Sequence, residues 1–357
     1  MAEQPSGRPR LRTRRAGRGR KPSTGDPRLD LHLQQLLSDL PVSESRIALE
    51  TVISAVKLAG EDLTRLDRKI INSTIKELRY AFHVFAPYRH IRKVSIFGSA
   101  RTSKEDAEYA VAREFASKIA DRGWMVITGA GPGIMEAGHE GAGGERSFGA
   151  NIRLPMEAEP NTIIAEDEKL INFKYFFTRK LTFIKEAHAF VLFPGGFGTL
   201  DESFELLTLI QTGKSDLHPI VMLDQPGGTY WSSFDRYVRE ALTERGFISP
   251  EDSSLYRLAA TPEEAVEEIE SFYRVYHSQR VVDGRIVLRL NRPVSPQTMK
   301  ALSDEFNSSL RGPIEVVEAS EEEIRDDDVP DLPRIALGFD WEHAGVLRRL
   351  IDRLNET

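Results

Sequence analysis

Between residues 29 and 90 apolar residues recur at helical spacing, with few other signals. Three helices are predicted there, over 31–40, from the capping Ser43 to about 59, and from about 63 to 84. Pro87 follows the third pattern and ends it. Because no residue of this stretch suggests chemistry, we interpret it as a helical appendage that packs on the next domain or on a partner subunit.

From residue 91 to 278 short apolar runs alternate with helical patterns. Five strands are predicted, over 93–97, 124–128, 148–154, 189–193 and 219–223. Helices are predicted over 104–122, 134–142, 173–187, 203–211 and 263–276. This alternation predicts an α/β fold with a Rossmann-like, doubly wound parallel sheet, which binds its ligand at the carboxyl ends of the strands.

The last stretch, 279–357, predicts a small C-terminal α/β domain. Its strands are expected over 285–290, 314–318 and 334–339, and its helices over 295–310 and 341–354. An acidic run at 321–331 interrupts this pattern, and such a run either binds a cation or forms a solvated loop. No motif assigns this domain a role.

Composition narrows the class of protein. The length of 357 residues favours two or three structural units, and no run approaches the roughly 18 apolar residues that span a bilayer. The chain has no cysteine, which excludes disulfides and cysteine-ligated metals and fits a cytoplasmic location. Residues 1–30 lack the apolar segment of a secretory signal. A net charge of −7 argues against nucleic-acid binding by the whole protein.

The first 28 residues carry the opposite charge and predict a disordered basic tail. Their basic residues lie among glycine, proline and serine: Arg8, Arg10, Arg12, Arg14, Arg15, Arg18, Arg20 and Lys21. So few apolar side chains cannot bury enough surface to fold. Either this tail binds RNA or DNA phosphates, or it is a solvated segment with weak affinity for polyanions.

A glycine-rich turn joins the fourth predicted strand to the helix after it. Such a turn presents unpaired backbone N–H groups at the positive end of a helix, which suits a phosphate. Its candidate phosphate ligands are Gly195, Gly196, Gly198 and Thr199. The alternative is a capping box between Thr199 and Glu202, which needs no ligand. A cap alone, however, does not explain three glycines.

A second glycine turn, Gly129-Ala130-Gly131-Pro132-Gly133, follows the second strand. A dinucleotide fingerprint requires G-x-G-x-x-G and an acidic residue about 20 positions later. Here Gly133 comes one residue early, and the third strand offers Asn151 and Arg153 without an acid. The pattern therefore favours a mononucleotide over a dinucleotide ligand.

Three motifs together carry a family resemblance. The Arg179-Lys180 pair, the Pro194–Thr199 turn and Glu202 resemble the LOG (LONELY GUY) family of cytokinin riboside 5′-monophosphate phosphoribohydrolases and bacterial nucleotide nucleosidases. The loop Gly98-Ser99-Ala100-Arg101 and the stretch 129–136 are similar to the other two loops of that family. The resemblance covers about residues 93–247.

The resemblance implies hydrolysis of the N-glycosidic bond of a nucleoside 5′-monophosphate, without a metal or cofactor. It places Arg179 and Glu202 in the catalytic positions, and a carboxylate there suits the oxocarbenium character of the transition state. It assigns nucleotide binding to Gly98, Ser99, Gly129, Gly131, Gly133, Lys180, Gly195, Gly196, Gly198 and Thr199. Members of the family assemble as dimers or larger oligomers, and apolar residues on several faces of 173–187 favour a homo-oligomer here too.

The sequence also departs from the family. Plant-type members carry a glutamate and a methionine where this chain has Thr182 and Phe183, so AMP-like nucleotides fit better than cytokinin precursors. The name lysine decarboxylase, often given to this family, finds no support, because no motif supplies the lysine and acidic partner that pyridoxal phosphate requires. Two other functions stay open: a nucleotide or molybdenum-cofactor carrier on the same fold, and a nucleic-acid-associated protein acting through the basic tail.

Overall fold

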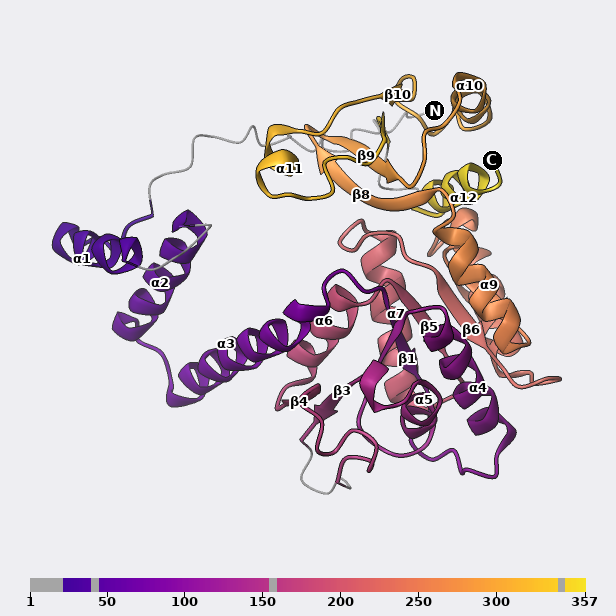
Figure 1. Cartoon of the computed structure of the whole chain (residues 1–357), viewed down its shortest axis with the longest axis horizontal. Coiled ribbons are helices and arrows are strands. Elements are labelled where there is room, and N and C mark those ends of the chain that lie inside the picture. Colours follow the sequence, from indigo (N-terminus) through magenta and orange to yellow (C-terminus); the bar gives the residue numbers. More distant parts are fainter. Residues whose placement is uncertain (1–21, 40–44, 154–158, 340–343) are drawn as a thin grey trace, which may run out of the picture. The chain divides into compact units, whose positions relative to one another are not determined.

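The computed structural model describes residues 22–39, 45–153, 159–339 and 344–357 (Figure 1). The chain divides into two compact units, Met1–Ser73 and Thr74–Thr357. Most of the predicted basic tail lies outside the described residues, as do the predicted cap Ser43, the end of the third predicted strand and the start of the last predicted helix. Among the described residues, no helix combines the length and the apolarity that a bilayer span requires.

The predicted N-terminal helices are present. They are α1 (Pro27–Ser38), α2 (Ser45–Gly60) and α3 (Arg65–Phe85). Asp26 caps α1 by accepting hydrogen bonds from the backbone N–H groups of Arg28 and Leu29, and Pro27 occupies the first helical position. Helix α3 begins in the first unit and ends in the second.

A seven-stranded parallel sheet forms the centre of the second unit. Its strands are β1 (Lys93–Phe97), β2 (Met125–Thr128), β3 (Ser147–Ile152), β4 (Leu170–Phe173), β5 (Ala189–Leu192), β6 (Ile220–Leu223) and β7 (Arg257–Ala259). The strand order is β4-β3-β2-β1-β5-β6-β7. Because the order reverses direction between β1 and β5, the predicted doubly wound topology is confirmed, with its switch point at that pair.

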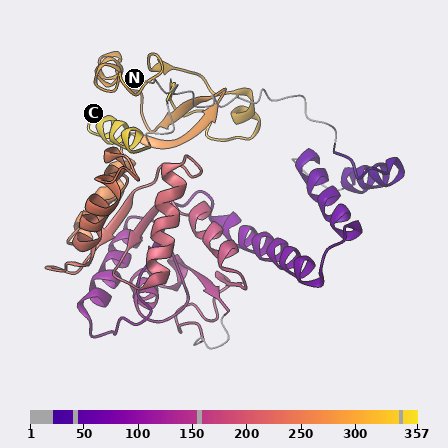
Figure 2. The ribbon, with the colours of Figure 1, turned by 180° about the vertical axis from the view of Figure 1, so that it is seen from behind.

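Helices cover both faces of this sheet in the two opposite views (Figures 1 and 2). They are α4 (Ala107–Asp121), α5 (Ile134–Ala142), α6 (Phe176–Glu186), α7 (Phe197–Gln211), α8 (Tyr230–Tyr237) and α9 (Pro262–Phe272). Short helices of other types are η1 (Ala86–Tyr88), η2 (Gly144–Arg146), η3 (Val238–Thr243) and η4 (Pro250–Leu255). Strands β1, β2, β5 and β6 are buried at every position, as their uninterrupted apolar runs require.

Several boundaries differ from those that the apolar pattern predicts, and three of the differences change the element to which residues belong. Phe173 ends β4 and is fully buried in the sheet, so its assignment to the following helix was wrong. Helix α7 begins at Phe197 rather than after the glycine turn. Helix α9 ends at Phe272, and Tyr276 instead begins a strand of the C-terminal sheet.

The C-terminal part contains a four-stranded antiparallel sheet. Its strands are β8 (Tyr276–Val282), β9 (Arg285–Leu290), β10 (Glu315–Val316) and β11 (Arg334–Leu337), in the order β10-β11-β9-β8. Its helices are α10 (Pro296–Glu305), α11 (Glu321–Arg325) and α12 (Ala344–Asn355). Helix α12 contacts α9 and β8, and this sheet belongs to the same compact unit as the parallel sheet.

The acidic run at 321–331 is not simply a solvated loop. It forms α11, which Ser320 and Glu323 begin with a capping box. Glu323 is buried and accepts hydrogen bonds at 2.8 and 2.9 Å from the guanidinium of Arg289. Burial alone would raise the pKa of Glu323, but the hydrogen bonds from Ser320 and Arg289 outweigh it and lower the pKa to about 2. This buried carboxylate therefore links α11 to β9.

Candidate active site

A cavity of about 770 Å³ lies at the carboxyl ends of β1, β2 and β5, at the switch point of the sheet. Its walls come from the loop after β1, from Gly129 after β2, from α6 and from the glycine turn after β5. Of the predicted site residues, those that line it are Gly98, Ser99, Gly129, Arg179, Gly195, Gly196, Gly198, Thr199 and Glu202. The fold thus brings together segments that are up to about 100 residues apart in sequence.

The glycine turn after β5 has the geometry of an anion site. Gly196 occupies the N-cap of α7, and it has no side chain to accept a hydrogen bond from the first helical turn. The backbone N–H groups of that turn have no acceptor within the helix, and the residues that carry them line the cavity. Thr199 lies inside this first turn and not at the cap, so the capping-box alternative with Glu202 is wrong.

Gly195 must be glycine for a steric reason. A Cβ atom built at this position would overlap the side-chain hydroxyl of Thr199 and approach the backbone nitrogen of Ser99 to 3.1 Å. The same nitrogen donates a hydrogen bond of 3.1 Å to the Pro194 carbonyl. Tight packing of the two loops therefore sets the shape of the turn.

The loop after β2 is held against the loop after β1. Gly133 has a φ of +69°, and a Cβ there would overlap the Ser99 carbonyl. The backbone N–H of Ile134 donates to that carbonyl at 3.0 Å. Gly131 and Gly133 are not among the residues that line the cavity. They instead allow the loop to pack closely against its neighbours. Their predicted role in contacting a nucleotide stays a prediction.

Arg179 and Glu202 face the same cavity from two different helices. Arg179 lies on α6, where its guanidinium carbon is 5.3 Å from the ring centre of Phe183. Glu202 lies in the second turn of α7, and its side chain is only 12% exposed. Burial raises the pKa of Glu202 to about 7, although Lys180 and Arg179 oppose this shift. A carboxyl group that titrates near neutral pH suits a general acid or base.

Lys180 is buried and does not line the cavity. Its ammonium nitrogen is 2.6 Å from a carboxylate oxygen of Asp201, 2.8 Å from one of Glu205 and 4.0 Å from one of Glu202. The positive charge of Lys180 therefore offsets the negative charges of these three carboxylates on α7. We expect Lys180 to act on the charge of Glu202 rather than on a phosphate.

The cavity also has lining residues that the sequence patterns missed, and four of them bear on its shape. Phe176 was interpreted as helix core, but it is 48% exposed and lines the cavity, as does Phe197, which is 94% exposed. Met135 lies where a Cβ on Gly129 would overlap its sulfur. Tyr230 donates a hydrogen bond of 2.7 Å to the Gly195 carbonyl. Of these four residues, only Phe197 lies within a motif that the sequence marks as a site, because it stands between two glycines of the turn.

The two departures from the plant-type pattern lie behind the cavity wall. The hydroxyl of Thr182 donates to the Thr178 carbonyl at 2.9 Å, within α6. The ring of Phe183 is fully buried and packs edge-on against Phe97, with 4.8 Å between ring centres. Neither side chain lines the cavity, so any influence on base preference acts through Arg179 or Phe97.

The pKa of Glu202 predicts that the stability of the protein depends on pH. The folded protein binds the proton of the Glu202 carboxyl group more tightly than the unfolded chain does, in which glutamate titrates near pH 4.5. That extra stability is fully present below about pH 4.5 and is lost as the pH rises through about 7. The glutamine of the Glu202→Gln variant cannot ionise. In urea unfolding at pH 8 we therefore expect the free energy of unfolding of this variant to be about 1–3 kcal/mol higher than that of wild type.

The difference between Glu202→Gln and wild type should shrink as the pH is lowered toward 5. The matched control is Glu205→Gln, on the same helix but outside the cavity wall. A difference that stays constant from pH 5 to 8 would show that proton binding at Glu202 is not its source.

The cavity thus combines an anion seat with a carboxyl group and a guanidinium. Among the described residues, no cluster of three or more histidine, aspartate or glutamate side chains has the geometry of a metal site. The arrangement suits reactions of a phosphorylated ligand in which positive charge develops near Glu202.

Comparisons with known proteins find relatives of the part of the chain that forms this cavity. Residues 133–269 match a family model described as "Possible lysine decarboxylase". The chain is 30% identical over 189 residues to a probable cytokinin riboside 5′-monophosphate phosphoribohydrolase, LOGL3, of Oryza sativa subsp. japonica; the match covers 52% of this chain and 83% of the relative. It is also 30% identical over 152 residues to the pyrimidine/purine nucleotide 5′-monophosphate nucleosidase of Escherichia coli strain K12, covering 40% of this chain and 34% of that enzyme.

The solved structures that match part of this chain include the molybdenum cofactor carrier protein of Chlamydomonas reinhardtii. The identity is 19%, the TM-score is 0.34, and the match covers 50% of this chain and 96% of that structure.

Proposed function

Because the chain belongs to the LOG family, we propose that it hydrolyses the N-glycosidic bond of nucleoside 5′-monophosphates such as AMP, releasing the free base and ribose 5-phosphate. The observation that supports this proposal best is the convergence of Arg179, Glu202 and the glycine turn on one cavity. The glycine turn precedes α7 and Glu202 lies in the second turn of that helix, so one ligand in this cavity can meet the turn with its phosphate and the carboxyl group with its sugar.

The phosphate is held by the first turn of α7. Its backbone N–H groups, from Phe197 to Thr199, present donors and the positive end of the helix dipole to an anion. The hydroxyl of Thr199 is close to Gly195 and adds a further donor at this end of the cavity. A nucleotide anchored here places its ribose along the wall that Glu202 forms.

Bond cleavage separates the base from C1′ of the ribose. The C1′–N bond breaks, its electron pair goes to the base nitrogen, and positive charge develops on C1′ and the ring oxygen. The carboxylate of Glu202 stabilises this charge and accepts a proton from the water whose oxygen forms the new bond to C1′. Glu202 then transfers this proton to the nitrogen of the departing base, which leaves as the neutral free base, and Arg179 stabilises negative charge on the base before this transfer or on the phosphate.

The direct test is incubation with a panel of nucleoside monophosphates. We expect equal amounts of free base and ribose 5-phosphate, measured by chromatography, from at least one purine or pyrimidine monophosphate. A nucleotide that binds in calorimetry but is never cleaved would contradict the enzyme and favour a carrier on the same fold.

We also propose that the protein is a homodimer with the cavity near the subunit contact. Helix α6 exposes Phe176, Phe177 and Leu181, each about half exposed, and Phe176 lines the cavity together with Arg179. A monomer rarely exposes such an apolar surface to solvent, and the commonest way to bury it is a dimer interface with two-fold symmetry.

Light scattering at low micromolar concentration tests this assembly. We expect a dimeric mass for wild type and a monomeric mass for Leu181→Glu, which places a charge on the exposed face of α6. The matched control is Thr208→Glu on the exposed side of α7, which should stay dimeric. A monomeric wild type with full nucleosidase activity would contradict both the assembly and the shared position of the site.

A further inference from the structure

Tyr230 holds the glycine turn of the candidate active site, although it belongs to neither of the two elements that the turn connects. Its hydroxyl donates a hydrogen bond of 2.7 Å to the Gly195 carbonyl, 35 positions away in sequence. Burial raises the pKa of this hydroxyl above its usual value, so the group stays protonated at neutral pH and remains a donor. The reaction steps proposed above give Tyr230 no role.

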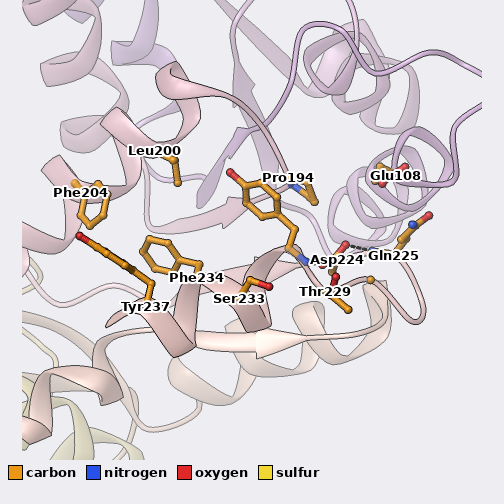
Figure 3. Close-up of a pocket in the computed structure, with 12 residues that line it drawn as sticks. Glu108, Pro194, Leu200, Phe204, Asp224, Gln225, Thr229, Ser233, Phe234 and Tyr237 are labelled. Carbon is orange, nitrogen blue, oxygen red and sulfur yellow. Dashed lines mark hydrogen bonds between the residues drawn. The ribbon is translucent and has the colours of Figure 1, made fainter. Parts of the chain in front are cut away.

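The loop between β6 and α8 fixes the position of this tyrosine, and it also lines a neighbouring cavity of about 790 Å³ (Figure 3). One carboxylate oxygen of Asp224 accepts a hydrogen bond from the backbone N–H of Gln225, and the other accepts one from that of Tyr230, both at 2.9 Å. A Cβ on Gly228 would overlap this carboxylate. The ring of Tyr230 packs edge-on against the buried Trp231, with 4.8 Å between ring centres. Asp224 and Trp231 together therefore hold Tyr230 in place.

A hydrogen bond to the Gly195 carbonyl orients a whole peptide unit. This carbonyl and the N–H of Gly196 belong to one planar trans peptide, in which the two groups point in opposite directions. Because the carbonyl faces the Tyr230 hydroxyl, the Gly196 N–H points away from that hydroxyl. The N–H has no hydrogen-bond acceptor in the described part of the chain, and Gly196 lines the cavity of the candidate active site. It can therefore bind an anion there.

This peptide needs a restraint because a glycine stands on each side of it. Glycine lacks the Cβ that limits backbone rotation, so a peptide between two glycines turns over more easily than one between other residues. A peptide turned over in this way would present the carbonyl oxygen of Gly195, with its partial negative charge, in place of the N–H, and it would repel a phosphate. The preceding peptide is restrained in the same manner, since the Ser99 N–H donates to the Pro194 carbonyl at 3.1 Å.

We propose that Tyr230 is a positioning residue, which keeps the Gly196 N–H directed at the phosphate of the bound ligand. The ligand class is a phosphate monoester, and ribose 5-phosphate is its simplest probe. This role rests on the proposed function in one respect, because it takes the glycine turn as the phosphate seat. It does not require that the bound nucleotide is cleaved.

Calorimetric titration with ribose 5-phosphate tests the role, because this compound carries the phosphate without a base. We expect Tyr230→Phe, which removes only the hydroxyl, to weaken its binding about fivefold, since the hydrogen bond that restrains the turn is lost. The matched control is Tyr256→Phe, which removes a hydroxyl that donates to Asp235 at 2.8 Å. Tyr256 does not line the cavity, so this control should bind as wild type does. Equal affinities of wild type and Tyr230→Phe would overturn the proposal.

Asp224→Asn tests the path through the loop. An asparagine has one acceptor oxygen where the aspartate has two, so the N–H of Gln225 or of Tyr230 loses its partner. We expect this variant to weaken ribose 5-phosphate binding about as much as Tyr230→Phe does. The double variant should bind no more weakly than the weaker single variant, because both substitutions act through the same hydroxyl. Effects that add in the double variant would overturn this path.

A kinetic measurement separates positioning from a general loss of structure. In AMP cleavage we expect Tyr230→Phe to raise KM about fivefold and to keep kcat within about threefold of wild type, because the phosphate contact is the same in the ground state and the transition state. Equal losses of kcat/KM for AMP and for adenosine, which has no phosphate, would overturn the role. A protein that cleaves no nucleotide, but whose affinity for ribose 5-phosphate depends on Tyr230, would reject the proposed function and keep this role.

Discussion

Replacing Glu202 with glutamine is expected to lower kcat for AMP by at least about 10³-fold, because the substitution removes the charge that stabilises the transition state. The glutamine has nearly the same shape as the glutamate, so the cavity wall and the first turn of α7 stay in place. The Kd for AMP should change by less than about threefold, since the phosphate seat does not involve this side chain. Rates come from quenched-flow or chromatographic assays, and affinities from calorimetry with the variant.

The matched control for this prediction is Glu205→Gln. Glu205 lies one turn further along α7 and is bonded to Lys180, but it does not line the cavity. Its kcat should stay within about tenfold of wild type, because only the electrostatic surroundings of Glu202 change. A Glu202→Gln variant that keeps a rate within about tenfold of wild type would remove this carboxyl group from the chemistry and leave it a purely structural role.

The sequence predicted those elements in which one pattern dominates. β1, α5 and β9 have the predicted boundaries, because a short apolar run or a helical stripe ends there at a glycine, a proline or a charge. β4 and β7 were missed. β4 follows a charged stretch and has only four residues, and β7 has three, so neither rises above the surrounding sequence. Pairing with β3 and β6 stabilises them, and such long-range contacts leave no local signal.

The candidate site shows the same division. The glycine turns, Arg179 and Glu202 were predicted because their motifs are contiguous or carried by the family resemblance, and the fold places them around one cavity. Lys180 stands next to Arg179 in sequence but points to the acids of α7, because successive residues of a helix face different directions. Tyr230 reaches Gly195 from 35 positions away, a contact that only the tertiary structure can create.

AMP is expected to be cleaved with a kcat/KM at least about 10²-fold higher than adenosine, because two or three charge-assisted hydrogen bonds to the phosphate are each worth about 1.5–3 kcal/mol. The donors are the backbone N–H groups in the first turn of α7, which Gly196 leaves uncapped. Adenosine lacks the phosphate, so it loses this anchor and with it the placement of C1′ beside Glu202. The two substrates are compared under identical conditions by release of adenine.

A glycine variant tests whether the turn after β5 is the part of the cavity that binds the phosphate. In Gly195→Ala the new Cβ would overlap the Thr199 hydroxyl, so the turn must open and the advantage of AMP over adenosine should fall at least about tenfold. The matched control is Gly60→Ala at the end of α2, where a Cβ meets no atom within 4 Å and the advantage should be unchanged. Adenosine cleaved as fast as AMP by the wild-type protein would show that the glycine turn is not a phosphate seat. An unchanged preference in Gly195→Ala would place the phosphate elsewhere in the cavity.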